Sequence, residues 1–336
     1  MNKYIGLDGH SSTCRFYVTD ERGIELDDRQ VVTNGRLLVD YVRGIPGPKK
    51  LTFEESEMSH WFYGILKGEV DELIVCNPVH NQQYKKAKTD KLDAMNLCKL
   101  LRGGFLSAVY HDGSDRERLR SLMSSYQDLV GEAVRLKNRY KSLFRKNGQK
   151  IEGQGIYNDE SFLKDLKRPD QKFIGGQIYH LMEELEESRG RYVKEIRRAA
   201  GSFKEVRFLK TIPGIGDIQA AKIVSQVIDP KRFANKYKFF SYCGLVRHPR
   251  ESDGKSYGST RIWGNRILKC VYKMAGHSAL KGDSGLRTYY DGLRAKGLSH
   301  HNAANAVCRK IAAISLSLWK NQKKYDDKMI TGGLAK

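Results

Sequence analysis

Four carboxylates in the first hundred residues have the surroundings of metal ligands. Asp8 follows the strand-like run Tyr-Ile-Gly-Leu and precedes Gly-His, and Glu54 ends a second apolar run, Leu-Thr-Phe. Asp90 and Asp93 come just before an apolar helical segment and, three residues apart, share one face of that helix. Each carboxylate alone has a more ordinary explanation as a turn residue or a helix cap. The ordered set of four is what indicates chemistry.

Carboxylates that gather at one place repel each other unless cations lie between them. Hard oxygen ligands favour Mg²⁺, with Mn²⁺ as a second possibility, over zinc. Two such ions about 4 Å apart can hold the attacking and leaving oxygens of a phosphodiester. The set therefore predicts metal-dependent chemistry on a nucleic-acid backbone. Glu55 and Glu57 lie beside Glu54. We favour Glu54 over Glu55 because it continues the strand.

A second candidate region lies near the C-terminus. Residues 231–275 contain 11 Lys and Arg against Glu251 and Asp253, with aromatic residues interleaved. Basic side chains can neutralise phosphates, and aromatic rings can stack on bases. The nucleic-acid-binding candidates are Arg247, Arg250, Lys255, Arg261 and Arg266. Ser252 stands among them in Glu-Ser-Asp-Gly-Lys; taken alone, a serine in a polar loop is a turn residue.

The segment 209–216, Leu-Lys-Thr-Ile-Pro-Gly-Ile-Gly, joins two helical patterns. Its glycines, Gly214 and Gly216, are typical of a helix-hairpin-helix element, in which backbone N–H groups approach a phosphate at a helix N-terminus. A tight turn between two packed helices explains the same pattern equally well.

Several further elements must hold these residues in place. Residues 1–112 are predicted to form an α/β domain, with strands near 4–7, 14–18, 51–53 and 73–76 and helices near 37–42, 61–66 and 94–101. Residues 201–325 are predicted to be mainly helical, and residues 326–336 to be a disordered tail. No apolar run is long enough to span a bilayer, and the chain opens on a strand without a leader. We expect a cytoplasmic protein that does not enter the membrane.

Between the two candidate regions, residues 113–200 predict a helical arm. Apolar residues step by three and four through a heptad seam: Leu119, Leu122, Tyr126, Leu129, Ala133, Leu136, Tyr140 and Leu143. A glycine-rich break at 148–155 precedes a second helical pattern. The arm is either an antiparallel hairpin or a dimerising coiled coil, with an ordinary bundle helix as the alternative.

The charge of the chain is divided unevenly. The formal net charge is +21, yet residues 1–105 contain 15 basic and 15 acidic residues, so the whole excess follows residue 105. A neutral domain followed by a strongly basic remainder is typical of a protein that binds a polyanion, and nucleic acid is the commonest one in a cell. A merely soluble surface does not need this much charge of one sign.

The two candidate regions together resemble a known family. Gly6-Leu7-Asp8, Phe53-Glu54 with His60-Trp61 behind it, and Lys88-Thr89-Asp90-Lys91-Leu92-Asp93-Ala94 resemble the Asp-Glu-Asp-Asp domain of the bridge-RNA-guided insertion-sequence transposases (insertion sequence family 110), which are related to the Piv DNA invertases. That domain is similar to the RuvC resolvase, an RNase H-like fold. Gly-Leu-Val, a basic loop with Ser252, and the later Gly-Asn-Arg resemble the C-terminal transposase domain of the same family.

The resemblance implies that Asp8, Glu54, Asp90 and Asp93 are metal ligands and that Ser252 is the nucleophile. Two departures leave the serine register open: Arg247 stands where the family often has proline, and Asp253 where many members have a second glycine. Ser256 and Ser259 therefore remain alternatives.

The activity that the resemblance implies is transposition or recombination of DNA through a phosphoserine intermediate. The partners would be double-stranded donor and target DNA, a noncoding guide RNA, and further copies of the chain in a homodimer or homotetramer, at a bacterial or archaeal nucleoid. The alternatives are a Piv-type invertase without a guide RNA, a RuvC-like structure-selective endonuclease, and a non-catalytic binding scaffold.

Overall fold

The computed structural model describes residues 1–79, 89–261 and 264–331. Two compact units make up the chain, Met1–Glu117 and Arg118–Lys336, and each is described by itself. Among the described residues no helix is both long and apolar enough to cross a membrane.

The first unit is built on a six-stranded mixed sheet in the order β3-β2-β1-β4-β5-β6. β1 pairs antiparallel with β2 and parallel with β4, which is parallel to β5. This order is compatible with the RNase H-like fold expected from the sequence. The strands are β1 (Lys3–Gly9), β2 (Thr13–Thr19), β3 (Glu25–Val32), β4 (Lys49–Glu54), β5 (Glu72–Cys76) and β6 (Ala108–Val109).

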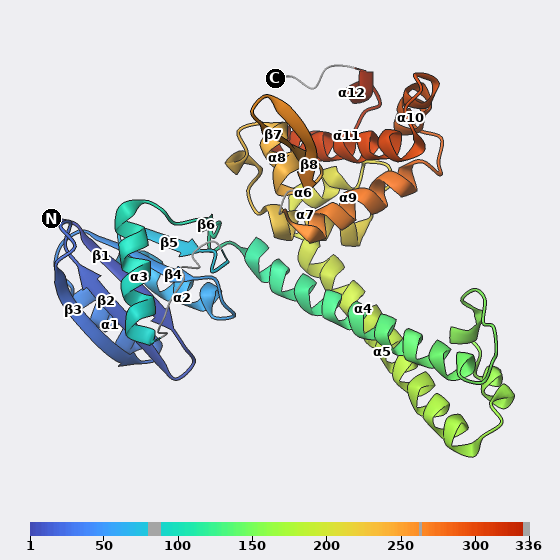
Figure 1. Ribbon diagram of the computed structural model, residues 1–336, viewed down its shortest axis with the longest axis horizontal. Helices are drawn as coiled ribbons and strands as arrows, with labels where there is room; N and C mark the ends of the chain where they lie inside the picture. Colours follow the sequence, from blue (N-terminus) through green and yellow to red (C-terminus); the bar gives the residue numbers. More distant parts are fainter. Residues whose placement is uncertain (80–88, 262–263, 332–336) are drawn as a thin grey trace. The chain divides into compact units, whose positions relative to one another are not determined.

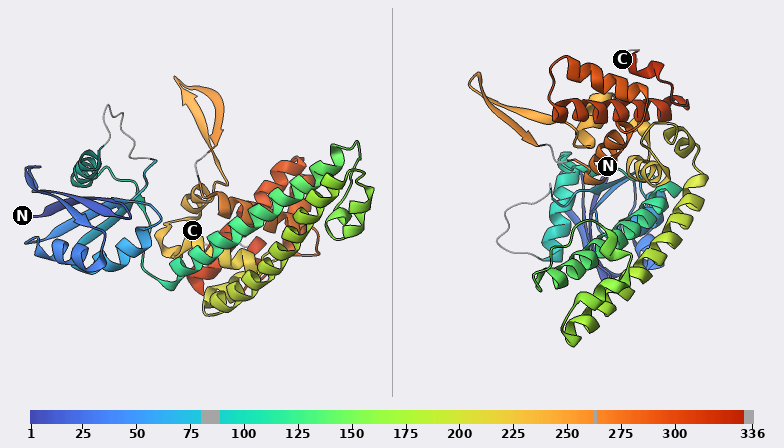
Figure 2. Two further views of the ribbon diagram at one scale, coloured as in Figure 1. Left: turned by 90° about the horizontal axis from the view of Figure 1, so that it is seen from below. Right: turned by 90° about the vertical axis from the view of Figure 1, so that its right-hand side faces the viewer.

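Helices cover both faces of this sheet (Figures 1 and 2). They are α1 (Gly35–Gly44), α2 (Ser59–Leu66) and α3 (Asp90–Gly103). Ile5, Leu7 and Phe53 pack with α1 and α2 in the main core. Because side chains alternate across a strand, Tyr4, Gly6 and Asp8 belong to the opposite face, where Tyr4 packs with Ala94 and Cys98 of α3.

Gly6 lets α3 lie directly on the sheet. A Cβ atom at this position would stand 2.1 Å from the carbonyl oxygen of Ala94 and 2.6 Å from the backbone nitrogen of Cys98. Only a residue without a side chain permits this approach, since the obstructing atoms are backbone. Gly6 therefore fixes the distance between α3 and β1, and with it the place where α3 begins.

A buried ion-pair network closes the end of this unit. His111 has a side chain only 4% exposed, and its Nε2 lies 2.7 Å from Oε2 of Glu55, the residue after β4. Its Nδ1 lies 3.2 Å from Oε1 of Glu117, whose other oxygen hydrogen-bonds to His60 at 2.9 Å. Burial alone would lower the pKa of His111, but Glu117 and Glu55 outweigh burial and raise it to about 9.

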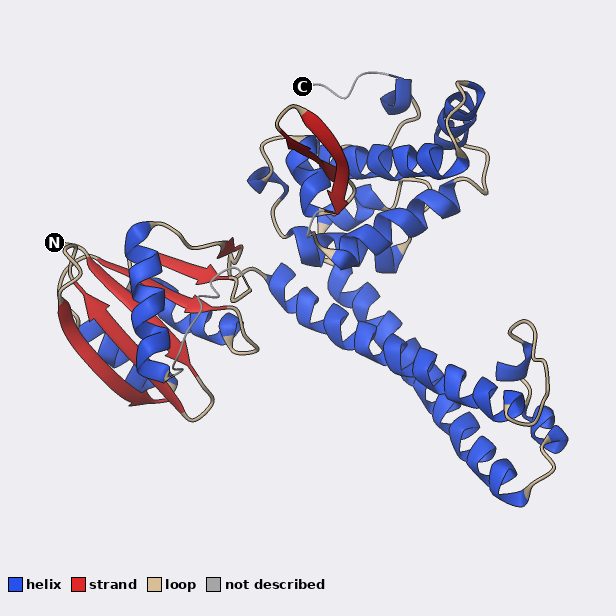
Figure 3. Ribbon diagram, viewed as in Figure 1, coloured by secondary structure: helices blue, strands red, loops and turns tan. Residues whose placement is uncertain are grey.

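The second unit is almost entirely helical (Figure 3). Its helices are α4 (Asp115–Arg145, which begins in the first unit), α5 (Pro169–Gly201), α6 (Lys204–Leu209), α7 (Asp217–Val227), α8 (Lys236–Tyr242), α9 (Arg266–Ala279), α10 (Gly285–Ala295), α11 (His300–Asn321) and α12 (Lys328–Thr331). Residues 311–319 of α11 are buried on nearly every side, as expected of a helical segment inside a core, and include Ile311, Ile314 and Leu318.

The long helices α4 and α5 run antiparallel, with ring contacts between Tyr126 and Tyr192 and between Tyr140 and Tyr179. Residues of α4 between Tyr126 and Tyr140 include none that is buried. The coiled-coil assembly expected for this segment stays a prediction. Part of the expected disordered tail is helical: α12 buries Ile330 in the core.

Two strands of the second unit were not expected from the sequence. β7 (Arg247–Ser252) and β8 (Lys255–Arg261) form an antiparallel ribbon. Every residue of β7 is exposed, and so are residues 255–260 of β8. Lacking a buried face, the ribbon shows none of the apolar alternation by which strands are recognised in a sequence.

Replacing Gly6 with alanine should destabilise the first unit by about 1–3 kcal/mol or more, because the new methyl group meets backbone that cannot give way. The urea midpoint followed by circular dichroism measures this loss. Gly64→Ala is the matched control, since a Cβ atom there meets nothing within 4 Å and helical Gly→Ala changes are neutral or stabilising. Equal midpoints for Gly6→Ala and the wild type would contradict the packing of α3 on β1.

The network also predicts a dependence of stability on pH. The pKa of His111 is raised from 6.5 to about 9, so its contribution is complete below pH 6.5 and lost as the pH rises toward 9. The pKa of Glu117 is lowered from 4.5 to about 2, against the effect of its burial, chiefly by His111 and the Asp112 N–H. That contribution is complete above pH 4.5 and lost toward pH 2.

The thermal midpoint of the wild type should therefore fall between pH 6.5 and 9 by on the order of several degrees. The decline should be shallower in His111→Gln, which lacks the charge. His180→Gln, at an exposed position of α5, should keep the wild-type slope. Parallel slopes for the wild type and His111→Gln would show that the histidine is not held as a cation.

Candidate metal and nucleic-acid sites

The four predicted carboxylates come from three neighbouring elements of the first unit. Leu7 is the register partner of Phe53 in the parallel pair β1–β4. Asp8 and Glu54 are the next residues of these two strands, so both lie at the carboxyl ends of adjacent strands. Glu54 continues the face of the buried Thr52, the partner of Gly6. Both carboxylates are thus on the face that α3 covers.

Asp90 and Asp93 lie in the first turn of α3. The Thr89 hydroxyl caps this helix by accepting a hydrogen bond from the Leu92 N–H at 3.3 Å. Carboxylates are stabilised at a helix N-terminus by the unpaired N–H groups there. Lys88 of the predicted motif lies outside the described residues.

Opposite charges anchor the start of α3 to the sheet. The Lys91 Nζ lies 2.7 Å from Oδ2 of Asp28 on β3, and Arg15 of β2 donates two hydrogen bonds of 2.6 Å to the same carboxylate. The hydrogen bonds from Arg15, and then that from Lys91, lower the pKa of Asp28. Lys91 therefore ties the first turn of α3 to β3.

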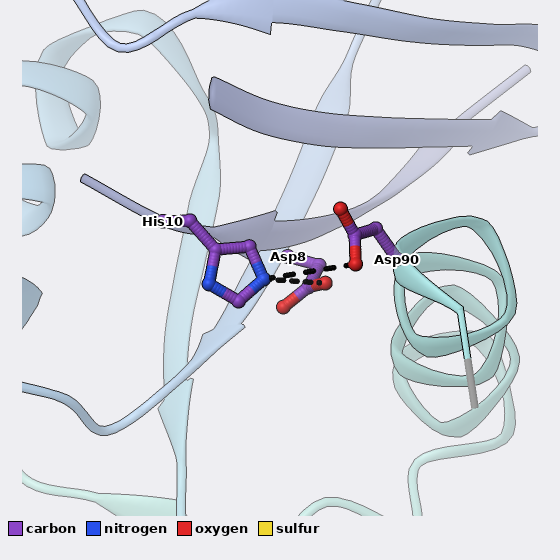
Figure 4. Close-up of side chains that lie close together, drawn as sticks. All are labelled: Asp8, His10 and Asp90. Carbon is purple, nitrogen blue, oxygen red and sulfur yellow. Dashed lines mark hydrogen bonds and ion pairs between the residues drawn. The ribbon is translucent and has the colours of Figure 1, made fainter. Parts of the chain in front are cut away.

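Three side chains converge at the end of β1: Asp8, His10 and Asp90 (Figure 4). His10 Nε2 lies 3.3 Å from Oδ2 of Asp8 and 3.9 Å from Oδ1 of Asp90. Within the described part of the chain, these are the three His, Cys, Asp or Glu side chains that could together hold a metal ion. Their ligand atoms all lie within 4.8 Å of one another. It includes two of the predicted ligands, and His10, which the sequence interpretation did not include.

Burial raises the pKa of Asp8, and the negative charges of Asp93 and Asp90 raise it further, while His10 lowers it. Asp93 is therefore close enough to Asp8 to be felt electrostatically. Burial is the largest cause of the raised pKa, and the neighbouring carboxylates add to it. The carboxylate oxygens fit a Mg²⁺ or Mn²⁺ ion, whereas an imidazole nitrogen is not a ligand that Mg²⁺ prefers.

The neighbours of Glu54 are arranged differently. Glu55 accepts a hydrogen bond from His111 at 2.7 Å and so belongs to the buried network. Glu57 is exposed in the turn before α2. These positions favour Glu54 among the three glutamates, although its carboxylate is not part of the three-residue cluster with Asp8.

Ser252 is the last residue of β7 and lies beside the turn of the ribbon. Asp253 and Gly254 form the turn, with φ angles of 50° and 69°. Positive φ at both central residues defines the type I′ hairpin turn, for which Asp-Gly is a preferred sequence. Ser252 pairs with Lys255, whereas Ser256 pairs with Glu251. Ser252 and Ser256 therefore face opposite sides of the ribbon.

The predicted nucleic-acid-binding residues fall into two groups. Arg247, Arg250 and Lys255 are exposed on the ribbon, and Arg266 is exposed at the start of α9. Arg261 is the last residue of β8, but its side chain lies outside the described residues. The Gly-Asn-Arg motif has a structural role as well, since the Asn265 side chain caps α9 by accepting from the Leu268 N–H at 2.9 Å.

Gly214 and Gly216 lie in the turn between α6 and α7. Gly214 has φ +88°, and a Cβ atom there would stand 2.2 Å from the carbonyl oxygen of Ala275 in α9. The N-terminus of α7 already carries Asp217, which pairs with Lys210 and, at 2.9 Å, with Arg197. Packing thus explains Gly214, and a phosphate at this helix end would meet a carboxylate. The helix-hairpin-helix function stays a prediction.

Relatives of known name match this chain in part. An uncharacterized 43.6 kDa protein of insertion element IS110 from Streptomyces coelicolor is 28% identical over 125 residues, which are 37% of this chain and 31% of that protein. The putative transposase y4qE of Sinorhizobium fredii is 24% identical over 66% of this chain and 57% of its own length. The transposase for insertion sequence element IS1111A of Coxiella burnetii is 21% identical over 80% of this chain and 76% of its own length. The chain thus spans less than two thirds of the first two relatives.

Family models match both candidate regions. Residues 5–149, which contain the four carboxylates, match a transposase model named for a DEDD motif and for IS110. Residues 206–291, which contain Ser252, match the model described as transposase IS116/IS110/IS902 family. On these two matches, the chain belongs to the IS116/IS110/IS902 family of transposases.

Proposed function

We propose that this protein cuts and rejoins DNA as a transposase, with a divalent-metal site in its first unit and Ser252 as the nucleophile. The observation that carries the proposal is the convergence of Asp8, His10 and Asp90 at the carboxyl end of β1, in a chain of a transposase family. The proposed ligands are Asp8, Glu54, Asp90 and Asp93, and His10 is the partner of Asp8. Mg²⁺ is the proposed ion, and Mn²⁺ the alternative.

The carboxylates would hold the metal ion and would thereby set where a phosphate can approach. A bound divalent cation would supply electrophilic polarisation of a phosphate oxygen at this place. The residues themselves do the positioning: β1 and β4 fix Asp8 and Glu54, and the cap and tether of α3 fix Asp90 and Asp93. His10 orients the Asp8 carboxylate through their contact of 3.3 Å.

Ser252 provides the covalent step. Its hydroxyl oxygen attacks phosphorus, the bond from phosphorus to one sugar oxygen breaks, and the hydroxyl proton passes through solvent to that leaving oxygen. The phosphoserine conserves the bond energy of the phosphodiester. A sugar hydroxyl of another strand then attacks the phosphoserine and releases Ser252 unchanged. The mechanism requires the metal site and Ser252 to act at one phosphodiester, although they belong to different compact units.

The ribbon supplies positive charge around this serine. Arg247, Arg250 and Lys255 are exposed on it. Guanidinium and ammonium groups can hold the phosphates that flank the reacting one and can stabilise charge as it develops there. A serine without such neighbours would be a weak nucleophile.

The substrate and partners follow from the proposed activity and the family. They are double-stranded donor and target DNA, a noncoding bridge RNA that specifies both, and a homodimer or homotetramer of the chain. The basic second unit can bind either nucleic acid, because affinity for phosphate does not distinguish RNA from DNA. A Piv-type invertase would use the same chemistry without RNA, and a resolvase-like nuclease would hydrolyse the strand without a serine.

The first experiment looks for a covalent protein–DNA adduct. Purified protein, its co-purifying RNA and Mg²⁺ are incubated with donor and target DNA, and denaturing gels resolve the adduct. The wild type should form it, and Ser252→Ala should not. Ser256→Ala is the matched control, because its side chain faces the other side of the same ribbon; it should form the adduct at the wild-type level.

Each result separates the candidates. Loss of the adduct after RNase treatment supports the bridge RNA, whereas an adduct that resists RNase indicates the invertase. Free ends with both the wild type and Ser252→Ala would establish the nuclease and contradict the serine mechanism. An adduct in Ser252→Ala but not in Ser256→Ala would move the nucleophile to Ser256.

The metal site predicts an order of binding affinities. Asp8→Asn should weaken Mn²⁺ binding by on the order of 10–100-fold or more, as measured by electron paramagnetic resonance or calorimetry. His10→Gln should weaken it by a smaller factor within that range. The reason is that Asp8 is a proposed ligand and His10 its partner. Asp40→Asn, at an exposed position of α1, should leave the affinity unchanged. Wild-type affinity in Asp8→Asn would exclude a metal site at the end of β1.

A further inference from the structure

A cavity of about 170 Å³, with a mostly apolar wall and several polar side chains at it, lies in the second unit between α9 and the beginning of α11. This volume is more than ten times the roughly 15 Å³ that a single water needs. Leu280, Ala304 and Cys308 contribute to the wall, and the polar groups come from Lys273 and His277 of α9 and from His300, His301 and Asn305 of α11. Neither the metal site nor the ribbon includes any of these residues.

The close packing of α9 on α11 brings these side chains together. A Cβ atom on Gly276 would stand 2.7 Å from the sulfur of Cys308, so the two helices touch at that point. Lys273 and His277 are four residues apart and share a face of α9, and His301 and Asn305 share a face of α11 in the same way. Donors from two helices therefore border one cavity.

The cavity has the electrostatic character of an anion site. No carboxylate is among its lining residues. α11 is 22 residues long, and its N-terminal end, which bears His300 and His301, carries the positive end of the helix dipole. His300 is oriented by a hydrogen bond of 2.6 Å between its Nδ1 and the Tyr290 hydroxyl. Lys273, His277 and His301 are exposed, so a ligand can reach them from solvent.

A metal ion is the less suitable ligand. Among the described residues, Asp8, His10 and Asp90 are the three side chains whose ligand atoms lie close enough together, within 4.8 Å of one another, to hold a metal ion. The three histidines of the cavity are thus not gathered as metal ligands. The ammonium group of Lys273 would also repel a cation, whereas ammonium, imidazole and amide donors suit a tetrahedral oxyanion.

We propose that this cavity is a phosphate-binding subsite, with Lys273, His277 and His301 as its principal donors. The phosphate can come from a nucleic-acid backbone or from a free phosphate monoester, which share the same chemistry. The nucleic-acid source rests on the proposed function, since it would give the second unit a grip on a strand away from Ser252.

The test measures binding, which does not require cleavage. Fluorescence anisotropy gives the affinity of the full chain for a labelled single-stranded DNA, a duplex and an RNA over a range of KCl concentrations. ³¹P line broadening reports inorganic phosphate. The variants are Lys273→Gln and the double variant His277→Gln/His301→Gln. Lys204→Gln, exposed at the start of α6 and outside the cavity, controls for the loss of one positive charge.

A backbone subsite predicts that Lys273→Gln weakens nucleic-acid binding several-fold and lowers the salt slope by roughly 0.7–0.9, more than Lys204→Gln does. A free phosphate would be the ligand if the wild type broadens the phosphate signal, the double variant does not, and both bind the oligonucleotides equally well. Wild-type behaviour of both cavity variants with every probe would overturn the proposal. Because Ser252→Ala should bind normally, failure of the proposed transposition would leave this result standing.

Discussion

The geometry of the first unit depends on one contact between backbones, that of α3 against β1 at Gly6. A side chain there would push the helix off the sheet. Because Asp8 lies two residues beyond Gly6 on the same face of the strand, the contact that seats the helix also sets how far its first turn stands from Asp8. The acidic cluster is therefore a consequence of packing: Asp90 and Asp93 reach the strand end because Gly6 places no side chain between β1 and α3.

Electrostatics then sorts the charged groups around this contact. Other carboxylates of this unit have basic partners of their own. Asp28 pairs with Arg15 and Lys91. Glu55 accepts a hydrogen bond from His111. Burial raises the pKa of Asp8, and the nearby charges of Asp93 and Asp90 raise it further against the effect of His10. The aspartates thus gather at one strand end, where a cation would offset their mutual repulsion.

The sequence predicted the parts of this structure that have a repeating apolar pattern. The four predicted strands and three predicted helices of the first unit are present, because each buries a face whose period can be counted. β3 was missed, since Glu-Leu-Asp-Asp-Arg-Gln is largely polar at the sheet edge. The ribbon was missed as well, although Asp253-Gly254 is a hairpin signal that could have found it. His10 could not be assigned, because its nearness to Asp90 arises only when strand and helix pack. The ligand set as a whole and the role of Ser252 stay predictions.

The exposed ribbon has a consequence for how this protein can diverge. None of the residues of β7, nor residues 255–260 of β8, is buried, so the core gains nothing from their identity. Insertions and substitutions there leave the folded state almost as stable as before, while Asn265 and Gly264 at its base are constrained by capping and by close packing against Gly244. The amino acids of the ribbon can therefore change during evolution with little cost to folding.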